Sequence, residues 1–230
     1  MINSNTKELL KQLLPINNQM IIQNTMTGAD EFKSLLFKAN IGAIDDIPEE
    51  VGIFDTANFL AAMDLLEDAT VTLKNKMLTA TDGDTTLQFL TSDVSSLDDV
   101  QVDVKKIDTT VAVPSTLEFM FTDEIVKKVK KASAVFKTFD TLWVINENRT
   151  TEIKLGTKNS FSKSNNAFSI KLDTTLNLGK EFSIALPIDS ILKVPSMEYT
   201  FCVKYNEKRD AYRVTLENEL LTFVMSLQDS

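Results

Sequence analysis

Hydrophobic and polar residues alternate along most of this chain, which is the pattern of half-buried β-strands. The alternation is clearest in five segments: 69–75, 85–91, 182–186, 199–205 and 211–217. Short polar turns punctuate the chain between such segments, for example Asp82-Gly83-Asp84 and the NEKRD run at 206–210. Because strands joined by such short turns run in opposite directions, we expect antiparallel sheets.

Four segments show the helical period instead. They span residues 5–14, 55–66, 121–137 and 187–193. In the third, Thr122 suits the N-cap position, and Asp123 and Glu124 suit the positive end of the helix dipole. The apolar side of this third helix predicts a buried face formed by Ile125, Val129, Ala132 and Phe136.

The order of these elements repeats. Residues 51–93 and residues 181–226 both read as a strand, a helix and three strands. Another helix followed by strands precedes each block, at 7–22 and at 123–145. We therefore predict an α+β fold with two similar domains, each with two helices packed on antiparallel sheets. The predicted divisions are a first domain at 1–93, an extended interdomain connector at 94–113 and a second domain at 114–230.

Length and composition fit this interpretation. The chain has 230 residues, of which 43% are hydrophobic and 25% charged, as in folded soluble domains of ordinary size. No apolar run approaches the roughly 18 residues that a membrane-spanning helix needs. The first residues lack the pattern of a secretory signal, and the single cysteine, Cys202, excludes an internal disulfide. These features predict a protein of a reducing cytoplasm.

Residue usage argues against catalysis. The chain has no histidine, which excludes histidine-dependent triads and histidine-ligated metal sites. Its six glycines form no phosphate-binding loop. Aspartate-rich segments at 45–46, 82–84 and 97–103 remain, but they are typical of turns and solvated loops. We therefore expect a protein that is not an enzyme and that needs no metal or cofactor.

Charge is divided unevenly along the chain, whose net charge is −9. Residues 1–113 hold 8 basic and 18 acidic side chains, whereas residues 114–230 hold 16 and 15. Five lysines fall within the eleven positions from 127 to 137.

The helical period places Lys127, Lys130 and Lys131 opposite the predicted buried face, with Lys137 near the edge of the polar face. Lys7 and Lys11 lie one turn apart in the first helix, away from its leucines. An ordinary solvated face is one interpretation. The other is contact with a polyanion, because lysines bind phosphates without a fixed geometry and without sequence preference.

Three segments carry a resemblance to a known family: ELLKQLLPIN at 8–17, VGIFDTANFLAAMDLL at 51–66 and FDTLWVI at 139–145. Together with the repeated element order and the basic helix, they resemble the sliding clamp of T-even-type bacteriophages, the processivity factor of DNA polymerase. The resemblance spans nearly the whole chain, and none of its segments is a catalytic motif.

The resemblance implies a viral DNA replication protein that forms a homotrimeric ring around double-stranded DNA, with helices lining the hole and subunits joined by pairing of edge strands. It implies loading by an ATP-driven clamp loader, docking of the C-terminal tail of the DNA polymerase, and service to late-transcription factors. The protein would act in the cytoplasm of an infected bacterial host. The implied DNA-binding residues are Lys7, Lys11, Lys127, Lys130, Lys131 and Lys137.

The partner pocket is less defined by the sequence. Leu97 and Val100 in the connector are candidates for partner binding. The alternative is that both residues hold the connector against the sheet.

Two other classes of protein compete with the clamp. A β-rich viral structural or assembly protein would use the lysine helix against an acidic neighbour. A single-stranded DNA binder would interleave exposed aromatic and basic residues along a groove. The second is disfavoured because the lysines lie on helices and the aromatic residues on strands.

Overall fold

The structure is a computed structural model that describes residues 4–22, 25–40, 50–67, 69–97, 102–157, 168–207 and 210–228. Contacts divide the chain into two compact units. Unit 1 comprises residues 1–106 with 219–221, and unit 2 comprises residues 107–218 with 222–230. The predicted connector, 94–113, lies across this division.

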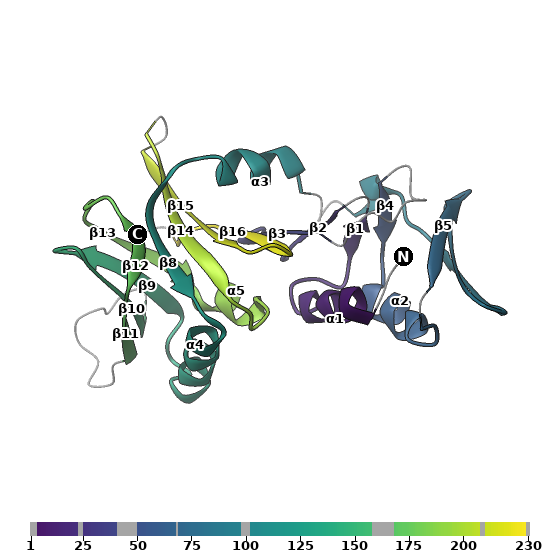
Figure 1. Ribbon diagram of the computed structural model, residues 1–230, viewed down its shortest axis with the longest axis horizontal. Coiled ribbons are helices and arrows are strands. Elements are labelled where there is room, and N and C mark those ends of the chain that lie inside the picture. Colours follow the sequence, from purple (N-terminus) through teal and green to yellow (C-terminus); the bar gives the residue numbers. More distant parts are fainter. Residues whose placement is uncertain are drawn as a thin grey trace. The chain divides into compact units, whose positions relative to one another are not determined.

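Unit 1 contains two α-helices and two antiparallel sheets among its described residues (Figure 1). Its elements are α1 (Ser4–Leu13), β1 (Met20–Ile22), β2 (Met26–Ala29), β3 (Leu35–Ala39), β4 (Val51–Ile53), α2 (Thr56–Met63), β5 (Thr70–Lys74), β6 (Met77–Asp82), β7 (Thr85–Leu90) and the 3₁₀ turn η1 (Val94–Ser96). Within the unit the strands pair in the orders β3-β2-β1-β4 and β5-β6-β7.

Unit 2 follows the same plan with additional strands. After α3 (Val104–Val111), which begins at the end of unit 1, come β8 (Ser115–Phe121), α4 (Asp123–Val135), β9 (Thr141–Glu147), β10 (Thr150–Gly156), β11 (Phe168–Leu172), β12 (Thr174–Asn177), β13 (Phe182–Pro187), α5 (Ile188–Lys193), β14 (Tyr199–Asn206), β15 (Ala211–Glu217) and β16 (Leu221–Met225). The strands pair in the orders β11-β10-β9-β13 and β12-β8-β14-β15-β16.

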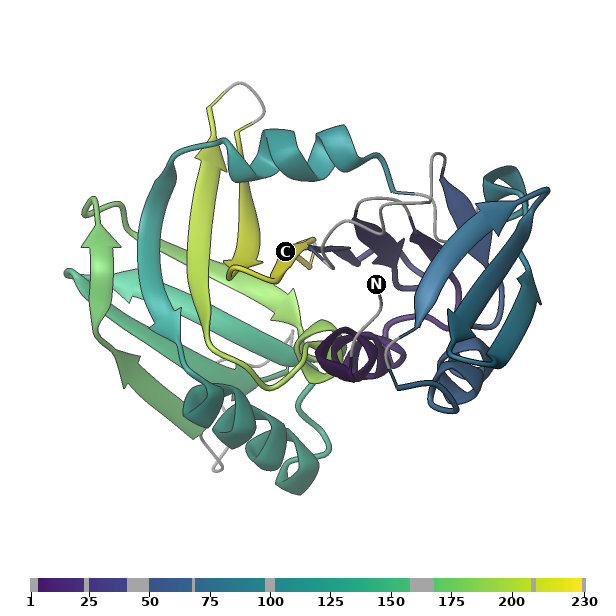
Figure 2. The same ribbon diagram turned by 45° about the vertical axis from the view of Figure 1, so that its right-hand side comes forward.

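The predicted repeat is confirmed at the level of sheet topology. The order β3-β2-β1-β4 in unit 1 corresponds to β11-β10-β9-β13 in unit 2, and β5-β6-β7 corresponds to β14-β15-β16. In each unit one helix precedes the first strand of this set and another follows the last: α1 and α2 in unit 1, α4 and α5 in unit 2. The two helices of each unit pack against each other (Figures 1 and 2).

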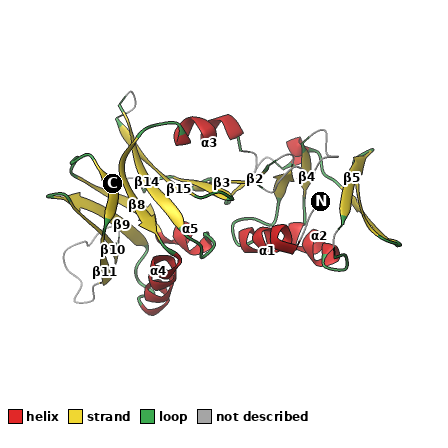
Figure 3. Ribbon diagram, viewed as in Figure 1, coloured by secondary structure: helices red, strands yellow, loops and turns green. Residues whose placement is uncertain are grey.

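Strand periodicity explains where the cores lie. On β8 and β14 of unit 2, alternate aromatic residues point inward, and Phe119 and Phe201 stack with ring centroids 4.5 Å apart. In unit 1 the rings of Phe59 from α2 and Phe89 from β7 meet edge to face at 5.0 Å. Aromatic pairs of this kind stabilise the packing between the elements that carry them. Figure 3 shows the helices and strands of the fold coloured by type.

Two expectations about local structure are wrong. The connector is not extended throughout, because residues 104–111 form α3. The Asp103 carboxylate accepts a hydrogen bond from the Lys105 amide at 3.0 Å, and Ile107 is fully buried. In α4, the buried face is formed by Val126, Val129, Ala132 and Ser133 instead of the set that includes Ile125 and Phe136.

The shift in α4 has a simple cause. Ile125 and Val126 are both apolar, so the pattern alone does not fix which of them faces the sheet. Phe136 is the C-cap and stacks on Phe139 at 5.0 Å, outside the helix. Among the described residues, no helix is both long enough and apolar enough to cross a membrane.

Candidate nucleic-acid interface

Helix α4 begins as its sequence predicts. The Thr122 hydroxyl oxygen accepts a hydrogen bond from the Ile125 amide at 3.3 Å, and Asp123 and Glu124 occupy the first turn. Both carboxylates pair one turn along the helix, Asp123 with Lys127 at 2.6 Å and Glu124 with Lys128 at 2.7 Å. The hydrogen bond and charge of Lys128 lower the pKa of Glu124. Both pairs are exposed, so each contributes little to stability and leaves its lysine accessible from solvent.

Lys131 and Lys137 are exposed, Lys131 on α4 and Lys137 just beyond its C-cap. With Lys127 and Lys128 they form the basic surface of α4. Lys127, Lys128 and Lys131 lie on the exposed side of α4 and Lys137 lies one residue beyond its C-cap, so their charges add over the helix and its C-terminal end.

Lys130 does not belong to this surface. Its side chain is half-buried, and its ammonium donates a hydrogen bond to the Val194 carbonyl oxygen at 2.6 Å, at the end of α5. Burial lowers the pKa of Lys130, and the nearby Asp123 charge opposes that shift. The lysine therefore serves a contact inside unit 2.

The two lysines of α1 are also engaged. Lys7 is only 7% exposed, and its ammonium donates to the carbonyl oxygens of Met63 at 3.2 Å and Leu66 at 2.7 Å. Lys7 thus lacks the exposed ammonium that a DNA contact requires. Lys11 lies at the surface between Glu8 at 2.8 Å and Asp64 at 2.9 Å. Hydrogen bonds from Lys11 to these two carboxylates raise its pKa.

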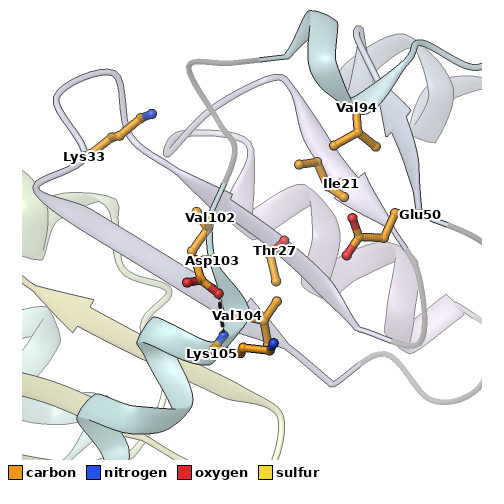
Figure 4. A pocket seen from close by; sticks show the side chains of 9 residues that line it. All are labelled: Ile21, Thr27, Lys33, Glu50, Val94, Val102, Asp103, Val104 and Lys105. Carbon is orange, nitrogen blue, oxygen red and sulfur yellow. Dashed lines mark hydrogen bonds between the residues drawn. The ribbon is translucent and has the colours of Figure 1, made fainter.

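A separate pocket of about 610 Å³ lies in unit 1 under the start of the connector (Figure 4). Its lining comes from β1, β2, the β2–β3 turn, the residue before β4, η1, and the start of α3 with the two residues before it. The lining combines four apolar side chains, one threonine and four charged side chains: Ile21, Val94, Val102 and Val104, then Thr27, then Lys33, Glu50, Asp103 and Lys105. Sequence analysis missed this pocket, although the valines at 94, 102 and 104 recur in a connector otherwise rich in Ser and Asp.

Leu97 lies beneath this pocket. Its side chain is 1% exposed and packs with Ile21 and Val94. A Cβ at Gly52 would lie 2.5 Å from a Leu97 methyl group, so the two segments are in close contact. Leu97 therefore holds the connector on the sheet, which is the alternative to a role in partner binding. Val100 lies outside the described residues.

Comparisons with known proteins agree with this architecture. No family model matches the chain. The sliding clamp of Vibrio phage KVP40 is 28% identical over 174 residues, which are 74% of this chain and 76% of that protein.

Solved structures extend the likeness to the whole fold. The proliferating cellular nuclear antigen of Entamoeba histolytica has a TM-score of 0.67 at 11% identity and covers 97% of this chain and 94% of its own. The proliferating cellular nuclear antigen of A. fulgidus, bound to the C-terminal region of FEN-1, has a TM-score of 0.65 at 10% identity. The match covers 97% of this chain and 95% of that protein.

Proposed function

We propose that this chain, which belongs to the sliding clamps of phage type, encircles duplex DNA as a ring and tethers the replicative DNA polymerase for processive synthesis. The observation that carries the proposal is the repeated unit itself, in which two helices pack on antiparallel sheets twice in one chain. Two comparisons support the proposal. One relative is a phage sliding clamp, and the structures with a similar fold include the proliferating cellular nuclear antigen of Entamoeba histolytica. The role is non-catalytic and belongs to the cytoplasm of an infected bacterium, where an ATP-driven clamp loader opens the ring.

The basic surface of α4 supplies most of the charge that faces DNA. Lys127, Lys131 and Lys137 are exposed there, and Lys127 pairs with one carboxylate, that of Asp123, whereas Lys11 is held between two. Exposed ammonium groups hold phosphates through non-directional contacts, which permit sliding. The encircling ring, and not the affinity of these contacts, keeps the protein on DNA.

Charge reversal tests the DNA-facing assignment. Substitution of Lys127, Lys131 and Lys137 by Glu changes three exposed side chains, so we expect an intact trimer with reduced loading or processivity. Lys74→Glu is the control, because Lys74 is exposed at the end of strand β5 and not on a helix. Wild-type processivity in the triple variant, with the trimer verified by native mass spectrometry, contradicts the assignment.

A ring needs a surface for a second copy of the chain, and β7 is suited to it. This strand ends the three-stranded sheet of unit 1, so among the described strands only β6 pairs with it, leaving backbone groups available on its other edge. Leu90 is 78% exposed and Phe54 is 62% exposed, and both line a pocket of about 390 Å³ beside this edge. A joint here covers apolar side chains that a monomer leaves in water.

Native mass spectrometry tests this joint. Leu90→Asp places a charge in the proposed interface and is expected to give monomers at concentrations where the wild type is trimeric. Leu178→Asp is the matched control, because Leu178 is 65% exposed in unit 2. Trimers of the Leu90 variant would refute this location of the joint, and open-ended assemblies of the wild type would favour a structural protein over a clamp.

The pocket under the connector is suited to the C-terminal tail of the polymerase. Ile21, Val94 and Val104 offer an apolar lining, and Figure 4 shows side chains from the connector and from the β1–β2 hairpin around one space. The FEN-1 segment on the A. fulgidus antigen supports peptide docking as a property of this fold. Late-transcription factors are further candidates for the same mode of docking.

Peptide binding measured by fluorescence anisotropy tests the pocket. We expect Val94→Glu to abolish binding of a peptide that copies the polymerase tail, because burying a carboxylate among valines is unfavourable. Ser95→Glu is the matched control, since Ser95 is the exposed neighbour on the same 3₁₀ turn. Equal affinity for the two variants would place the tail elsewhere.

A further inference from the structure

The second helix of unit 1 is fastened at both ends to the segment that starts with α1. At its N-terminal end, the Thr56 amide donates to the Asn18 carbonyl oxygen at 2.8 Å, just before β1. At its C-terminal end, the buried Lys7 ammonium donates to the carbonyl oxygens of Met63, the last helical residue, and of Leu66, three residues beyond it. Helix α2 is therefore held by a backbone contact at one end and by a lysine from α1 at the other.

Unit 2 contains the same pair of contacts. The amide of Ile188, the first residue of α5, donates to the Asp140 carbonyl oxygen at 2.9 Å, just before β9. The half-buried Lys130 ammonium of α4 reaches the Val194 carbonyl oxygen at the other end of α5. In each unit the first helix supplies the lysine, the end of the second helix supplies the carbonyl, and a residue just before the first central strand accepts from the helix N–H.

The chemistry of these contacts explains the use of lysine. The last carbonyl groups of a helix lack partners within the helix and carry the negative end of its dipole. An ammonium on a long flexible stem reaches them from a neighbouring helix and brings three donors. Such a buried cation is tolerated because carbonyl oxygens replace its water.

We propose that Lys7 and Lys130 are equivalent positioning residues, which fix the second helix of each unit against the first and do not contact DNA. The positioning role follows from the contacts of Lys7 and Lys130 alone. Its consequence rests on the proposed function: the helix pairs present a rigid surface to DNA, and the DNA contacts come from Lys127, Lys131 and Lys137. This separates five of the six lysines indicated by the sequence into cations that hold the fold and cations that face the ligand. The sixth, Lys11, is paired with Glu8 and Asp64.

Covalent labelling of lysines in the unmodified trimer tests the separation. With an amine-reactive ester and mass spectrometry, we expect Lys7 and Lys130 to react several-fold more slowly than Lys131 and Lys137, whether or not DNA is present. Encircled DNA should protect Lys131 and Lys137, and should leave exposed Lys74 unprotected. Fast labelling of Lys7 and Lys130 together with protection by DNA would overturn the inference.

Variants give an independent measurement. Lys7→Met and Lys130→Met keep an apolar stem but remove the ammonium, so we expect lower melting temperatures with an unchanged salt dependence of duplex binding. Lys131→Met should leave the melting temperature unchanged and weaken the salt dependence of duplex binding. The magnitude of the slope of log K against log salt falls by about 0.9 for each phosphate that is no longer neutralised. Unchanged melting with a reduced slope for Lys7→Met or Lys130→Met refutes the positioning role.

The two hypotheses fail in different ways. If Lys131→Met leaves the salt slope unchanged and DNA protects neither Lys131 nor Lys137, the DNA-facing assignment fails, while slow labelling of Lys7 and Lys130 still supports the positioning role. Should Lys7→Met prevent folding, the labelling of the wild-type protein decides the question.

Discussion

Lys204 ties α3 to unit 2 and offers a strong test of how the connector is held. Its side chain is 5% exposed, and its ammonium donates to the Val111 carbonyl oxygen at 2.8 Å and the Val113 carbonyl oxygen at 3.1 Å. It also lies 3.3 Å from a carboxylate oxygen of Glu217, which in turn accepts from the Thr215 hydroxyl. The last turn of α3 thus depends on one buried cation.

Lys204→Met retains most of the stem volume and removes the contacts of the ammonium with Val111, Val113 and Glu217. Two carbonyl groups lose a charged donor and Glu217, whose side chain is 27% exposed, loses its partner. Each unsatisfied buried group costs about 1–3 kcal/mol, and partial solvation of Glu217 reduces its share, so we expect a loss of roughly 3 kcal/mol in the free energy of unfolding.

Urea denaturation at pH 7 and fixed protein concentration measures this loss, and hydrogen exchange locates it. We expect faster exchange of the α3 amides and an unchanged m-value. Glu217→Gln is the control: its side-chain oxygen still accepts from Lys204, so its loss should be about 1 kcal/mol. A Lys204→Met variant as stable as the wild type, with unchanged exchange in α3, would show that the connector is held by other contacts.

Two further predictions concern packing and ionisation. Gly52→Ala places a methyl group 2.5 Å from Leu97 and is expected to lower the free energy of unfolding by about 1–3 kcal/mol, measured by thermal or urea denaturation. Gly156→Ala is the milder control, because its nearest neighbouring atom lies at 3.7 Å. An equal loss of stability in the two variants would contradict the argument. Burial raises the pKa of Tyr199 above its ordinary value of 10.0, so its contribution to stability is complete below pH 10 and is lost as the pH rises through the folded-state pKa. Tyr199→Phe, which removes the hydrogen bond to the Pro195 carbonyl oxygen, should flatten the alkaline limb of stability against pH, and an unchanged limb would refute this.

The strands were predictable because hydrophobic and polar residues alternate along the sequence. Segments 199–205 and 211–217 show this alternation and form β14 and β15, although each strand also has a run of consecutive buried residues. The repeat could also be predicted, since it depends on the order of elements and not on identity between the two units. Thr122 could be assigned as a cap because the signal lies within three residues of the helix start.

The connector helix was not predictable from the same signals. Alternation of Val100, Val102 and Val104 favours extended structure, since β-branched residues are typical of strands. Two interactions outweigh that local preference, and both depend on residues distant in sequence. Ile107 is fully buried, and Lys204 binds the carbonyl oxygen at the end of α3.

The roles of individual lysines could not be predicted from the sequence for a related reason. A helical wheel separates the polar face of α4 from its apolar face, but it does not show that the end of α5 lies within reach of Lys130. Lys7 is similar, because its carbonyl partners are more than fifty residues away. Contacts of this length depend on the packing of helices, which periodicity does not encode.

The charge asymmetry of the chain acquires a meaning from these contacts. In unit 1, Lys7 is buried and Lys11 is neutralised by Glu8 and Asp64, so the helix pair α1–α2 offers little net positive charge. In unit 2, Lys131 and Lys137 add to the ion-paired lysines at the start of α4. In the proposed ring of three chains, similar domains would therefore alternate between basic and nearly neutral inner surfaces, and the strongest phosphate contacts would recur three times around the hole. Spaced contacts of this kind let DNA shift from one phosphate to the next without releasing a continuous ring of bonds, which favours movement along the duplex over tight binding.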